Sequence, residues 1–431
     1  CRKRPKFSKY AILHGYDGSV FDYMSTNRRN FLAGLGAMAP ASHFAATQAA
    51  AAALPKVDYY ADLGVKPFIN AIGPYSSLGG AEMWPEVIAA MDYATGVKVR
   101  MDDLHDAVGQ RIAALTGADS AMVSSGATGA MILGTAACMT MGDEQRMERL
   151  PDSSEMPSEV IILKGQRYLY DRSIRAPGAH LVEVETAADI RAAVSDKTAM
   201  MFYLLNRPEQ ANIAAEEYIA IAKELGVPIF CDAATTVPPV GNIKKTVAMG
   251  FDLICYSGGK GLRGPYSAGL LLGRKDLIAY ARQNGSPNHR AYGRSMKVAP
   301  EEYLGMLVAV EKSLEFDEDA EFRRQSNVVN AMARELALIP GVTTVAAVPK
   351  GEAREPYIEV HWDKTRYDVD VAALKQALRE GDPPIEVRAL FLSNQQLHLT
   401  AVALKDGEAQ IVTGRIRGIL LQHETRANAD V

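Results

Sequence analysis

Short apolar, β-branched runs alternate with amphipathic helical stretches along the chain from about Tyr59 onward. This alternation constrains the fold most, because strands connected through helices pair in parallel and have both faces of their sheet covered. Strands are expected at residues 121–124, 159–163, 180–184, 199–203, 228–231, 253–256 and 269–272. Helical stretches this frequent argue against a β-sandwich. The sequence therefore predicts an α/β fold with a mostly parallel sheet.

The C-terminal part of the chain shows a different pattern. The stretch from Pro300 to Leu338 predicts one or two helices that leave the large domain. After it, a smaller α+β domain is expected, with strands at 357–362, 385–389 and 396–401. We therefore predict an upstream segment over residues 1–55, a large domain over 56–325 and a small C-terminal domain over 326–431.

Composition and charge narrow the class of partner. With 431 residues, 48% of them hydrophobic, the chain can bury a sizeable core. Its formal net charge of −4 and pI near 6.1 provide no bulk attraction to nucleic acid or to an anionic membrane, so a small-molecule substrate is expected. The cysteines form no Cys-x-x-Cys pair, and Cys138, Cys231 and Cys255 stand inside apolar runs. We interpret these three as core thiols and expect no metal site.

The upstream segment is typical of a targeting sequence. Arg28 and Arg29 precede an apolar stretch rich in glycine and alanine, and an alanine run over 45–53 ends before Leu54. This pattern resembles a twin-arginine export signal and predicts a periplasmic protein. The stretch is too short and too rich in small residues for a membrane span. A helix that simply leads into the fold, in a cytoplasmic protein, is the alternative.

A glycine-rich segment, residues 256–265, surrounds Lys260 and follows one of the expected strands. Its four glycines would let the backbone turn tightly and let a flat cofactor approach closely. A lysine at a strand end, in a pocket with few other charges, has a lowered pKa and can form a Schiff base. Taken alone, an ordinary surface loop with a solvated lysine explains the segment equally well.

Asp232 follows another apolar strand, residues 227–231. A carboxylate at the C-terminal end of a strand lies in the crevice where open α/β sheets bind ligands. There it could pair with the nitrogen of a pyridine ring and keep that nitrogen protonated. The alternative role is to cap the next element.

A third segment follows a strand and opens a helix that runs to about Met139. A helix N-terminus with hydroxyl groups and glycine offers backbone N–H groups and a favourable dipole to a phosphate. The residues of this turn are Ser125, Gly126, Ala127 and Thr128. A phosphate turn, an aspartate and a lysine, each at a strand end and in this order, together predict a site for pyridoxal phosphate (PLP).

These segments belong to a wider set of motifs between about Val57 and Leu420. The matching segments are 69–73, 78–80, 115–118, 125–127, 232–234, 257–260 and 293–298. With them, the chain resembles the SelA-like family of fold-type I PLP enzymes, which have the aspartate-aminotransferase-like fold. The Ser-Gly-Gly-Lys and Gly-Arg-x-Met-Lys segments resemble the D-glucosaminate-6-phosphate ammonia-lyase-like branch more than selenocysteine synthase.

The resemblance implies a role for each motif residue. Lys260 would carry PLP as a Schiff base, Asp232 would meet the pyridine nitrogen, and the turn from Ser125 to Thr128, with Ser257, would complete the cofactor site. Arg388 would bind a substrate carboxylate, since a guanidinium can hold it through two hydrogen bonds, although an exposed strand arginine fits as well. The resemblance also implies a homodimer or a higher homo-oligomer.

Three further residues are expected near the substrate or the cofactor. Arg294 and Lys297 would lie at the cofactor or at a subunit boundary, or else on a solvated basic face. Gln166 stands where relatives of the ammonia-lyase type carry a histidine, and a glutamine cannot move protons near neutral pH. His105 and His289 are candidates for the missing acid–base group.

The predicted function is that of a PLP-dependent lyase acting on an amino acid or an amino-sugar acid. Lys260 would take the Cα proton, the β-hydroxyl would leave as water, and the product would hydrolyse to a keto acid and ammonia. The cofactor site does not by itself choose the reaction. A PLP-dependent transferase, either selenocysteine-synthase-like or an aminotransferase, and a non-catalytic binding protein on the same fold remain alternatives.

Overall fold

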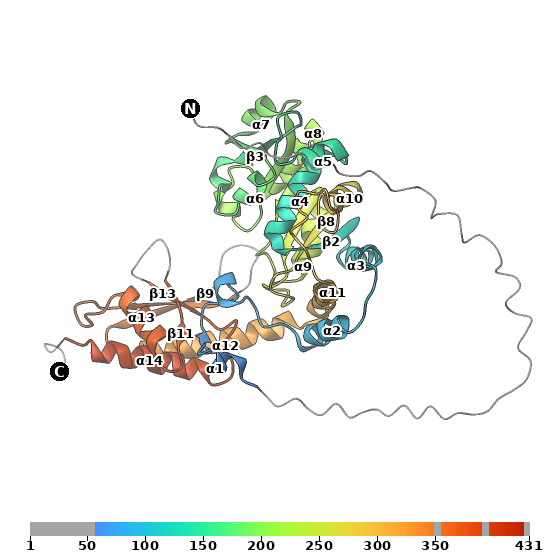
Figure 1. The fold of residues 1–431 in the computed structure, drawn as a ribbon. Helices are drawn as coiled ribbons and strands as arrows, with labels where there is room; N and C mark the ends of the chain where they lie inside the picture. The colour runs from blue at the N-terminus through green and yellow to red at the C-terminus, as the bar shows by residue number, and fades with distance from the viewer. Residues whose placement is uncertain (1–56, 349–354, 390–395, 426–431) are drawn as a thin grey trace, which may run out of the picture. The chain divides into compact units, whose positions relative to one another are not determined.

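The apolar runs form a central sheet, of which Figure 1 labels β2, β8 and β3. Its strand order is β2-β8-β7-β6-β5-β3-β4. The computed structural model describes residues 57–348, 355–389 and 396–425. The strands of this sheet are β2 (Ser120–Ser124), β3 (Glu159–Leu163), β4 (His180–Val184), β5 (Thr198–Leu204), β6 (Ile229–Asp232), β7 (Leu253–Ser257) and β8 (Gly269–Gly273). Every neighbouring pair is parallel except the two pairs that involve β8. The predicted α/β fold with a mostly parallel sheet is confirmed.

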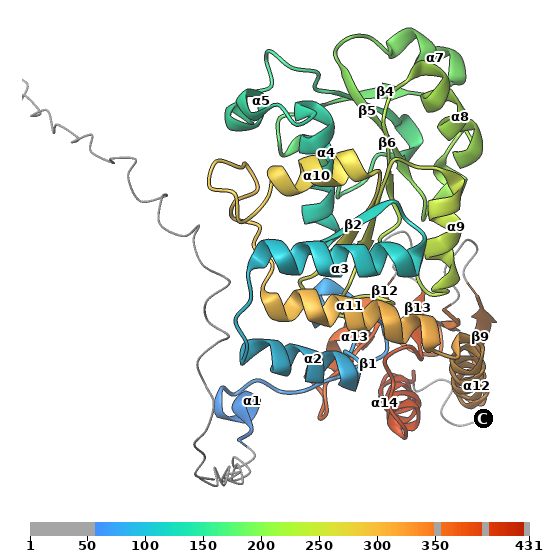
Figure 2. The ribbon, with the colours of Figure 1, turned by 90° about the vertical axis from the view of Figure 1, so that its right-hand side faces the viewer.

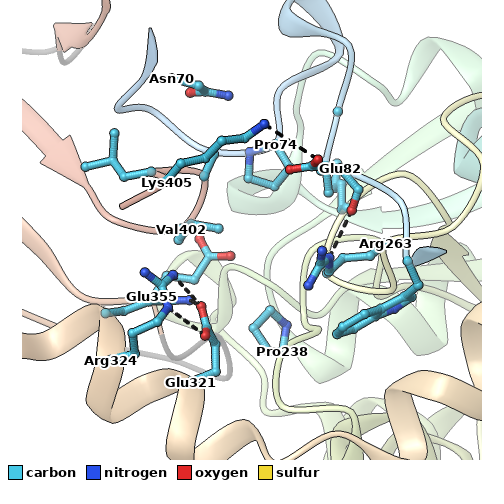
Figure 3. Close-up of a pocket in the computed structure, with 18 of the residues that line it drawn as sticks. Asn70, Pro74, Glu82, Pro238, Arg263, Glu321, Arg324, Glu355, Val402 and Lys405 are labelled. Carbon is cyan, nitrogen blue, oxygen red and sulfur yellow. Dashed lines mark hydrogen bonds and ion pairs between the residues drawn. The ribbon is translucent and has the colours of Figure 1, made fainter. Parts of the chain in front are cut away.

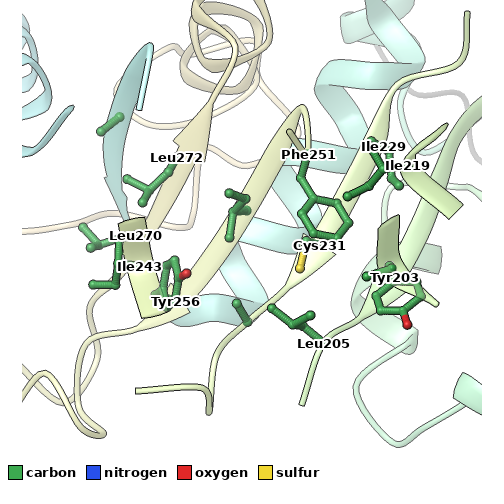
Figure 4. Packing of buried hydrophobic residues seen from close by; sticks show 14 of the residues in the cluster. Tyr203, Leu205, Ile219, Ile229, Cys231, Ile243, Phe251, Tyr256, Leu270 and Leu272 are labelled. Carbon is green, nitrogen blue, oxygen red and sulfur yellow. The ribbon is translucent and has the colours of Figure 1, made fainter. Parts of the chain in front are cut away.

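Helices cover both faces of the sheet because its strands are apolar on both sides. In β5, Met201 and Tyr203 point into one core cluster while Met200 and Phe202 point into the other. Figure 4 shows the first cluster, where Tyr203 and Phe251 belong to the same apolar layer. The helices of this part are α2 (Pro85–Thr95), α3 (Met101–Thr116), α4 (Gly126–Thr140), α5 (Glu144–Arg149), α6 (Arg172–Arg175), α7 (Ala187–Ala193), α8 (Ala215–Leu225), α9 (Gly241–Met249), α10 (Lys275–Gln283) and α11 (Pro300–Glu315).

The C-terminal part has its own sheet and its own core. Its four-stranded sheet has the order β12-β13-β10-β9, and α12 packs against β9 and β10. Residues such as Ile358, Leu374 and Ile416 form a third core cluster. The elements are α12 (Glu318–Ala337), β9 (Val342–Ala347), β10 (Tyr357–Trp362), α13 (Val371–Glu380), β11 (Ile385–Glu386), β12 (Arg388–Ala389), β13 (Leu397–Thr400) and α14 (Glu408–Gln422).

Two elements, α12 and β1 (Ile69–Asn70), are not confined to the domains that the sequence predicts for their residues. The helix α12 runs without a break through the predicted domain boundary at residue 325. The N-terminal strand β1, after the short helix α1 (Tyr59–Asp62), pairs in parallel with β11 of the C-terminal part. The chain therefore contributes its first described strand to the small domain before it enters the large one. Figure 2 shows α2, α3 and α11 as neighbours beside the central sheet.

The cysteines, the arginine pair and the apolar helices were each the subject of a prediction from the sequence. The three cysteines expected in the core, Cys138, Cys231 and Cys255, are buried free thiols. Arg28 and Arg29 of the expected export signal lie outside the described residues. Within the described ranges, no helix combines the length and the apolar character needed to cross a bilayer.

Candidate active site

The sheet brings the three predicted cofactor segments to one edge. The strands β2 and β7 point the same way because each pairs antiparallel with β8 between them. In this register Ser124, Gly269 and Ser257 lie side by side, and Asp232 pairs with Cys255 one strand further along. The phosphate turn after β2, the lysine loop after β7 and the end of β6 therefore meet at one edge.

The helix α4 begins at Gly126, directly after Ser125. Gly126 has φ +70°, a left-handed conformation that favours glycine. A Cβ on Gly269 would lie 2.5 Å from the carbonyl carbon of Gly126, so β8 holds the turn closely only because residue 269 has no side chain. In this turn Ser125 and Gly126 are half-buried, Ala127 is buried and Thr128 is exposed. The N–H groups at this helix start suit a phosphate.

The glycines around Lys260 are needed for packing rather than for an unusual backbone conformation. None of the glycines at 258, 259, 261 and 264 has a positive φ. A Cβ on Gly258 would lie 2.7 Å from the carbonyl oxygen of Ala268, and one on Gly259 would lie 2.8 Å from Cα of Tyr266. The segment is therefore a tightly packed support for the lysine and not a loose surface loop.

Asp232 is buried at the end of β6 and is held by three donors. The Tyr168 hydroxyl donates to its Oδ2 at 2.5 Å, the Ala234 N–H donates to Oδ1 at 2.9 Å, and the Cys255 thiol lies 3.7 Å from Oδ1. Burial, followed by the charge of Asp232, raises the pKa of Tyr168 far above its ordinary value, so this hydroxyl stays a donor. The carboxylate is thus fixed in position at the edge of the sheet.

Lys260 is half-buried, and burial lowers its pKa below the ordinary value. The charges of Asp232 and Glu355 oppose that shift. Burial raises the pKa of Glu355, while Arg388 and Lys260 lower it. Lys260, Asp232, Glu355 and Arg388 are therefore close enough to act on one another's charge.

Arg388 stands beside Tyr75, and its role as a carboxylate binder stays a prediction. Its guanidinium stands 5.4 Å from the ring centroid of Tyr75, and β12 places it on the small domain. Burial, opposed by the charge of Arg388, raises the pKa of Tyr75. The small domain thus supplies a cation to a site whose cofactor residues come from the large domain.

A cavity of about 720 Å³, lined in part by Lys260, lies between the two domains. Figure 3 shows other residues of its wall, among them Asn70 and Glu355. Asn70 and Glu355 line it together with Lys260. The Asn70 side chain is fixed because its Oδ1 accepts hydrogen bonds from the N–H groups of Ile72 and Gly73, both at 3.0 Å. This explains the Ile-Asn-Ala-Ile-Gly motif: its asparagine shapes a turn that forms one wall of the cavity.

The prediction that Gln166 contacts the substrate is wrong for this structure. Gln166 is completely buried, its Nε2 donates to the carbonyl of Leu204 at 2.9 Å, and its Oε1 accepts from the N–H of Leu204 at 3.0 Å. The Gln166 amide therefore satisfies the backbone N–H and the carbonyl of Leu204 at the end of β5, which would otherwise lack hydrogen-bond partners.

Arg294 and Lys297 are not brought to Lys260. They line a separate cavity of about 210 Å³ together with Ser124 and His105. His105 is buried and lies 2.5 Å from the Tyr303 hydroxyl, and burial, followed by the charge of Arg282, lowers its pKa to about 4. His289 is exposed. Neither histidine lines the cavity beside Lys260.

Tyr168 and Glu355 are candidate site residues that the sequence did not reveal. Tyr168 follows β3, so it stands at the same kind of strand end as Asp232, and that position is a signal that could have identified it. Glu355 stands before β10, outside any periodic pattern. Only the fold brings it to Lys260.

The site fits pyridoxal phosphate on the evidence of its own residues. A buried, triply hydrogen-bonded carboxylate suits a protonated pyridine nitrogen, a lysine with lowered pKa suits a Schiff base, and a helix start suits the phosphate. On a doubly wound sheet of this order, the combination defines the fold-type I class of PLP-dependent enzymes.

Comparison with known proteins gives the family. The model of the family "SelA: L-seryl-tRNA selenium transferase" matches residues 89–299. A 5'-C-glycyluridine monooxygenase-decarboxylase from a Streptomyces species is 32% identical, over 84% of this chain and 92% of that protein. D-glucosaminate-6-phosphate ammonia lyase from Salmonella typhimurium is 28% identical, over 84% of this chain and 97% of that protein.

Comparison with solved structures supports the same family and fold. A structure of D-glucosaminate-6-phosphate ammonia-lyase superposes with a TM-score of 0.75 at 26% identity, covering 85% of this chain and 99% of that one. A structure of SPT with PLP, at 16% identity, has a TM-score of 0.53 over 82% of this chain and 87% of that one, which shows the fold alone. The chain belongs to the SelA-like family of PLP-dependent enzymes, and its cofactor is pyridoxal phosphate.

Proposed function

We propose that this enzyme is a lyase that removes water and then ammonia from an amino acid with a hydroxyl group on its β-carbon. The observation that carries the proposal is that Lys260 and Glu355 line one cavity and that Arg388 lies close enough to Glu355 to lower its pKa. The three side chains would provide a base, an acid and a carboxylate holder in one site. The names of the relatives support it, because seryl, glucosaminate and 5'-C-glycyl groups all denote amino acids with an oxygen on the β-carbon.

The bound cofactor supplies an electron sink that stabilises negative charge at the substrate's Cα. Asp232, held by Tyr168 and Ala234, keeps the ring nitrogen protonated. Arg388 holds the substrate carboxylate through two hydrogen bonds and so orients the Cα–H bond. The turn from Ser125 to Thr128, with Ser257, binds the phosphate group.

Lys260 takes the Cα proton as the general base, and burial favours this role because it lowers the pKa of the amine. Glu355 gives a proton to the β-oxygen, a role that the burial-raised pKa of its carboxyl group favours. The Cβ–O bond breaks and water leaves. The resulting enamine takes up water and yields a 2-keto acid and ammonia.

A second candidate is oxidative decarboxylation. It is favoured by one observation, the 32% identity to a monooxygenase-decarboxylase, which is higher than the 28% identity to the ammonia lyase. The same cofactor residues would serve either reaction, because the bond that breaks is the one held perpendicular to the ring. The two reactions differ in their products: the lyase releases ammonia without consuming oxygen, whereas the monooxygenase consumes oxygen and releases carbon dioxide.

The active site is proposed to lie at the boundary of two copies of the chain. Large apolar side chains are exposed beside it: Leu169 is 78% exposed, and Tyr170 and Tyr266 are each 53% exposed. Tyr170 also acts on the pKa of Tyr75, which places it near Arg388. Sedimentation equilibrium of the PLP-loaded protein tests this, and a monomer at all concentrations would contradict it.

Export through a twin-arginine signal also stays a proposal. Arg28 and Arg29 support it by sequence pattern. Replacing both with lysine should retain the protein in the cytoplasm, as cell fractionation would show. An unchanged distribution would contradict the proposal.

The central experiment incubates the PLP-loaded enzyme with D- and L-β-hydroxy amino acids and amino-sugar acids and measures ammonia, carbon dioxide and oxygen. Ammonia without oxygen uptake supports the lyase, and its absence from the whole panel contradicts it. The Lys260→Ala variant should lose both the visible cofactor absorbance and the reaction. Lys244→Ala, at an exposed position on α9, is the matched control and should keep both.

A further inference from the structure

The cavity beside Lys260 contains more acidic than basic side chains among the residues that the structure describes. Its basic side chains are Lys260, Arg263, Arg324 and Lys405. Its acidic side chains are the glutamates Glu82, Glu318, Glu321, Glu355 and Glu408. Because Lys260 is committed to the cofactor, three cations face five acidic side chains among the described residues of this cavity.

The three remaining cations are already engaged (Figure 3). Arg324 makes two hydrogen bonds to the carboxylate of Glu321, at 2.8 and 2.7 Å. Lys405 lies 3.7 Å from the carboxylate of Glu82, and Arg263 donates to the backbone carbonyl of Glu82 at 2.9 Å.

Arg263 is engaged on its flat face as well. Its guanidinium stands 3.8 Å from the ring centroid of Trp84, and burial lowers its pKa. A phosphate group binds most strongly to an arginine that can offer its paired donors. Each arginine of this cavity would first have to give up a present partner.

The size of the cavity also bears on the substrate. A volume of about 720 Å³ is within the roughly 300–1,000 Å³ of sites that enclose whole metabolites, and it far exceeds the side chain of serine. Carboxylates and the Asn70 amide along its walls can accept and donate hydrogen bonds to hydroxyl groups. A cavity of this size and lining can hold a long polar tail.

We propose that this cavity binds an uncharged tail with several hydroxyl groups and discriminates against a phosphorylated tail. The inference rests on the proposed function, in that it names the substrate class of the same site. Binding a dianionic phosphate here would cost free energy, because the phosphate would give up its hydrating water and be repelled by carboxylates while the nearby cations already have partners. Hydroxyl groups carry no charge and are not repelled in this way. The name of the Salmonella relative gives a 6-phosphate as its substrate. The preference proposed for this cavity is the opposite one.

The test uses D-gluconate and 6-phospho-D-gluconate with the PLP-loaded enzyme. The two probes share one carbon chain and lack an amino group, so they bind without reacting. Calorimetric titration should give at least about a tenfold lower Kd for gluconate, or about 1.4 kcal/mol. Equal or tighter binding of the phosphate, or binding of neither probe, would overturn the proposal.

The Glu321→Gln variant provides a second readout. It removes the charged partner of Arg324, so the affinity for 6-phospho-D-gluconate should rise by about tenfold while that for gluconate changes much less. Glu217→Gln, at an exposed position on α8, is the matched control and should leave the ratio of affinities unchanged. An unchanged ratio in Glu321→Gln would count against the assigned role of the Glu321–Arg324 pair.

Failure of this inference can be told apart from failure of the lyase proposal. If gluconate binds more tightly but no amino acid releases ammonia, the cavity assignment stands and the lyase fails. If ammonia is released faster from D-glucosaminate-6-phosphate than from D-glucosaminate, the lyase stands and the cavity assignment fails.

Discussion

The hydroxyl of Tyr168 donates a hydrogen bond of 2.5 Å to Oδ2 of Asp232. The two residues are 64 positions apart in the chain, and they meet because β5 separates the ends of β3 and β6 by only one strand. The bond leaves Oδ1 to the backbone N–H of Ala234. The orientation of the Asp232 carboxylate, the proposed partner of the cofactor ring, therefore depends on a tyrosine from a different strand end.

The Tyr168→Phe variant should bind PLP but turn over more slowly. A hydrogen bond to a charged group contributes about 1.5–3 kcal/mol, so we expect kcat to fall roughly 10- to 100-fold. The cofactor absorbance should also titrate differently with pH, because a less firmly held Asp232 protects the ring nitrogen less well. Tyr93→Phe, at a side chain that is 66% exposed, is the control. An unaltered absorbance titration would exclude the proposed coupling.

Replacing Arg388 by lysine keeps the charge and removes the pair of parallel donors. We expect KM to rise by about tenfold or more with a smaller change in kcat, since one carboxylate hydrogen bond is lost. The cofactor absorbance should stay the same because Arg388 serves the substrate. Steady-state kinetics with the amino acid of the panel that reacts fastest tests this. An unchanged KM would show that Arg388 does not bind the substrate carboxylate.

Glu355 should be recognised by its effect on the pH profile. As an acid it is active when protonated, and burial raises its pKa, so kcat should fall as the pH rises through that raised pKa. In Glu355→Gln this limb should disappear and kcat should drop by about 100-fold or more. Glu217→Gln should preserve the full profile. A limb that persists in Glu355→Gln would assign the titration to another group.

His105 should make the enzyme less stable in acid. Burial lowers the pKa of His105 to about 4 from the ordinary value of 6.5. Between these two pH values the histidine is protonated in the unfolded chain but not in the folded chain. Stability therefore falls as the pH drops from about 6.5 to about 4, by roughly 3 kcal/mol in total. Urea unfolding of PLP-loaded protein at these pH values measures it. His105→Gln should lose most of this dependence, and the exposed-site variant His289→Gln should keep it.

Much of the fold follows from local sequence pattern. The strands β3 and β4 begin and end at the predicted residues. The strand β3 is an apolar run buried along most of its length, which leaves little choice of structure. The strand β4 lies at the edge of the sheet and is partly exposed, and Leu181, Val182 and Val184 carry its signal. Asp232 and Lys260 were predictable for the same reason, since each follows such a run. The strand β9 was not predicted. It lies at the edge of the small sheet and is only partly buried, so its sequence carries no continuous apolar signal.

The substrate side of the site depends on contacts that local pattern does not encode. Glu355 reaches Lys260 only because the small domain packs across the large one. The role of Gln166 was predicted wrongly because the resemblance places it where relatives of the ammonia-lyase type carry a histidine, and that correspondence does not show the hydrogen-bond partners of the amide. The partner is the backbone of Leu204, 38 residues away, and only the parallel pairing of β3 and β5 brings the two together.

Gln166 should thus matter for stability rather than for substrate binding. In Gln166→Ala the N–H and the carbonyl of Leu204 both lose their buried partner, at about 1–3 kcal/mol each. We expect the free energy of unfolding to fall by about 2–5 kcal/mol, while the KM of the folded fraction stays within about twofold of the wild type. Gln166→Glu should be worse than alanine, because a buried charge would face the Leu204 carbonyl. Urea titration and steady-state kinetics on the same preparations separate the two roles. A large rise in KM without loss of stability would return Gln166 to the substrate site.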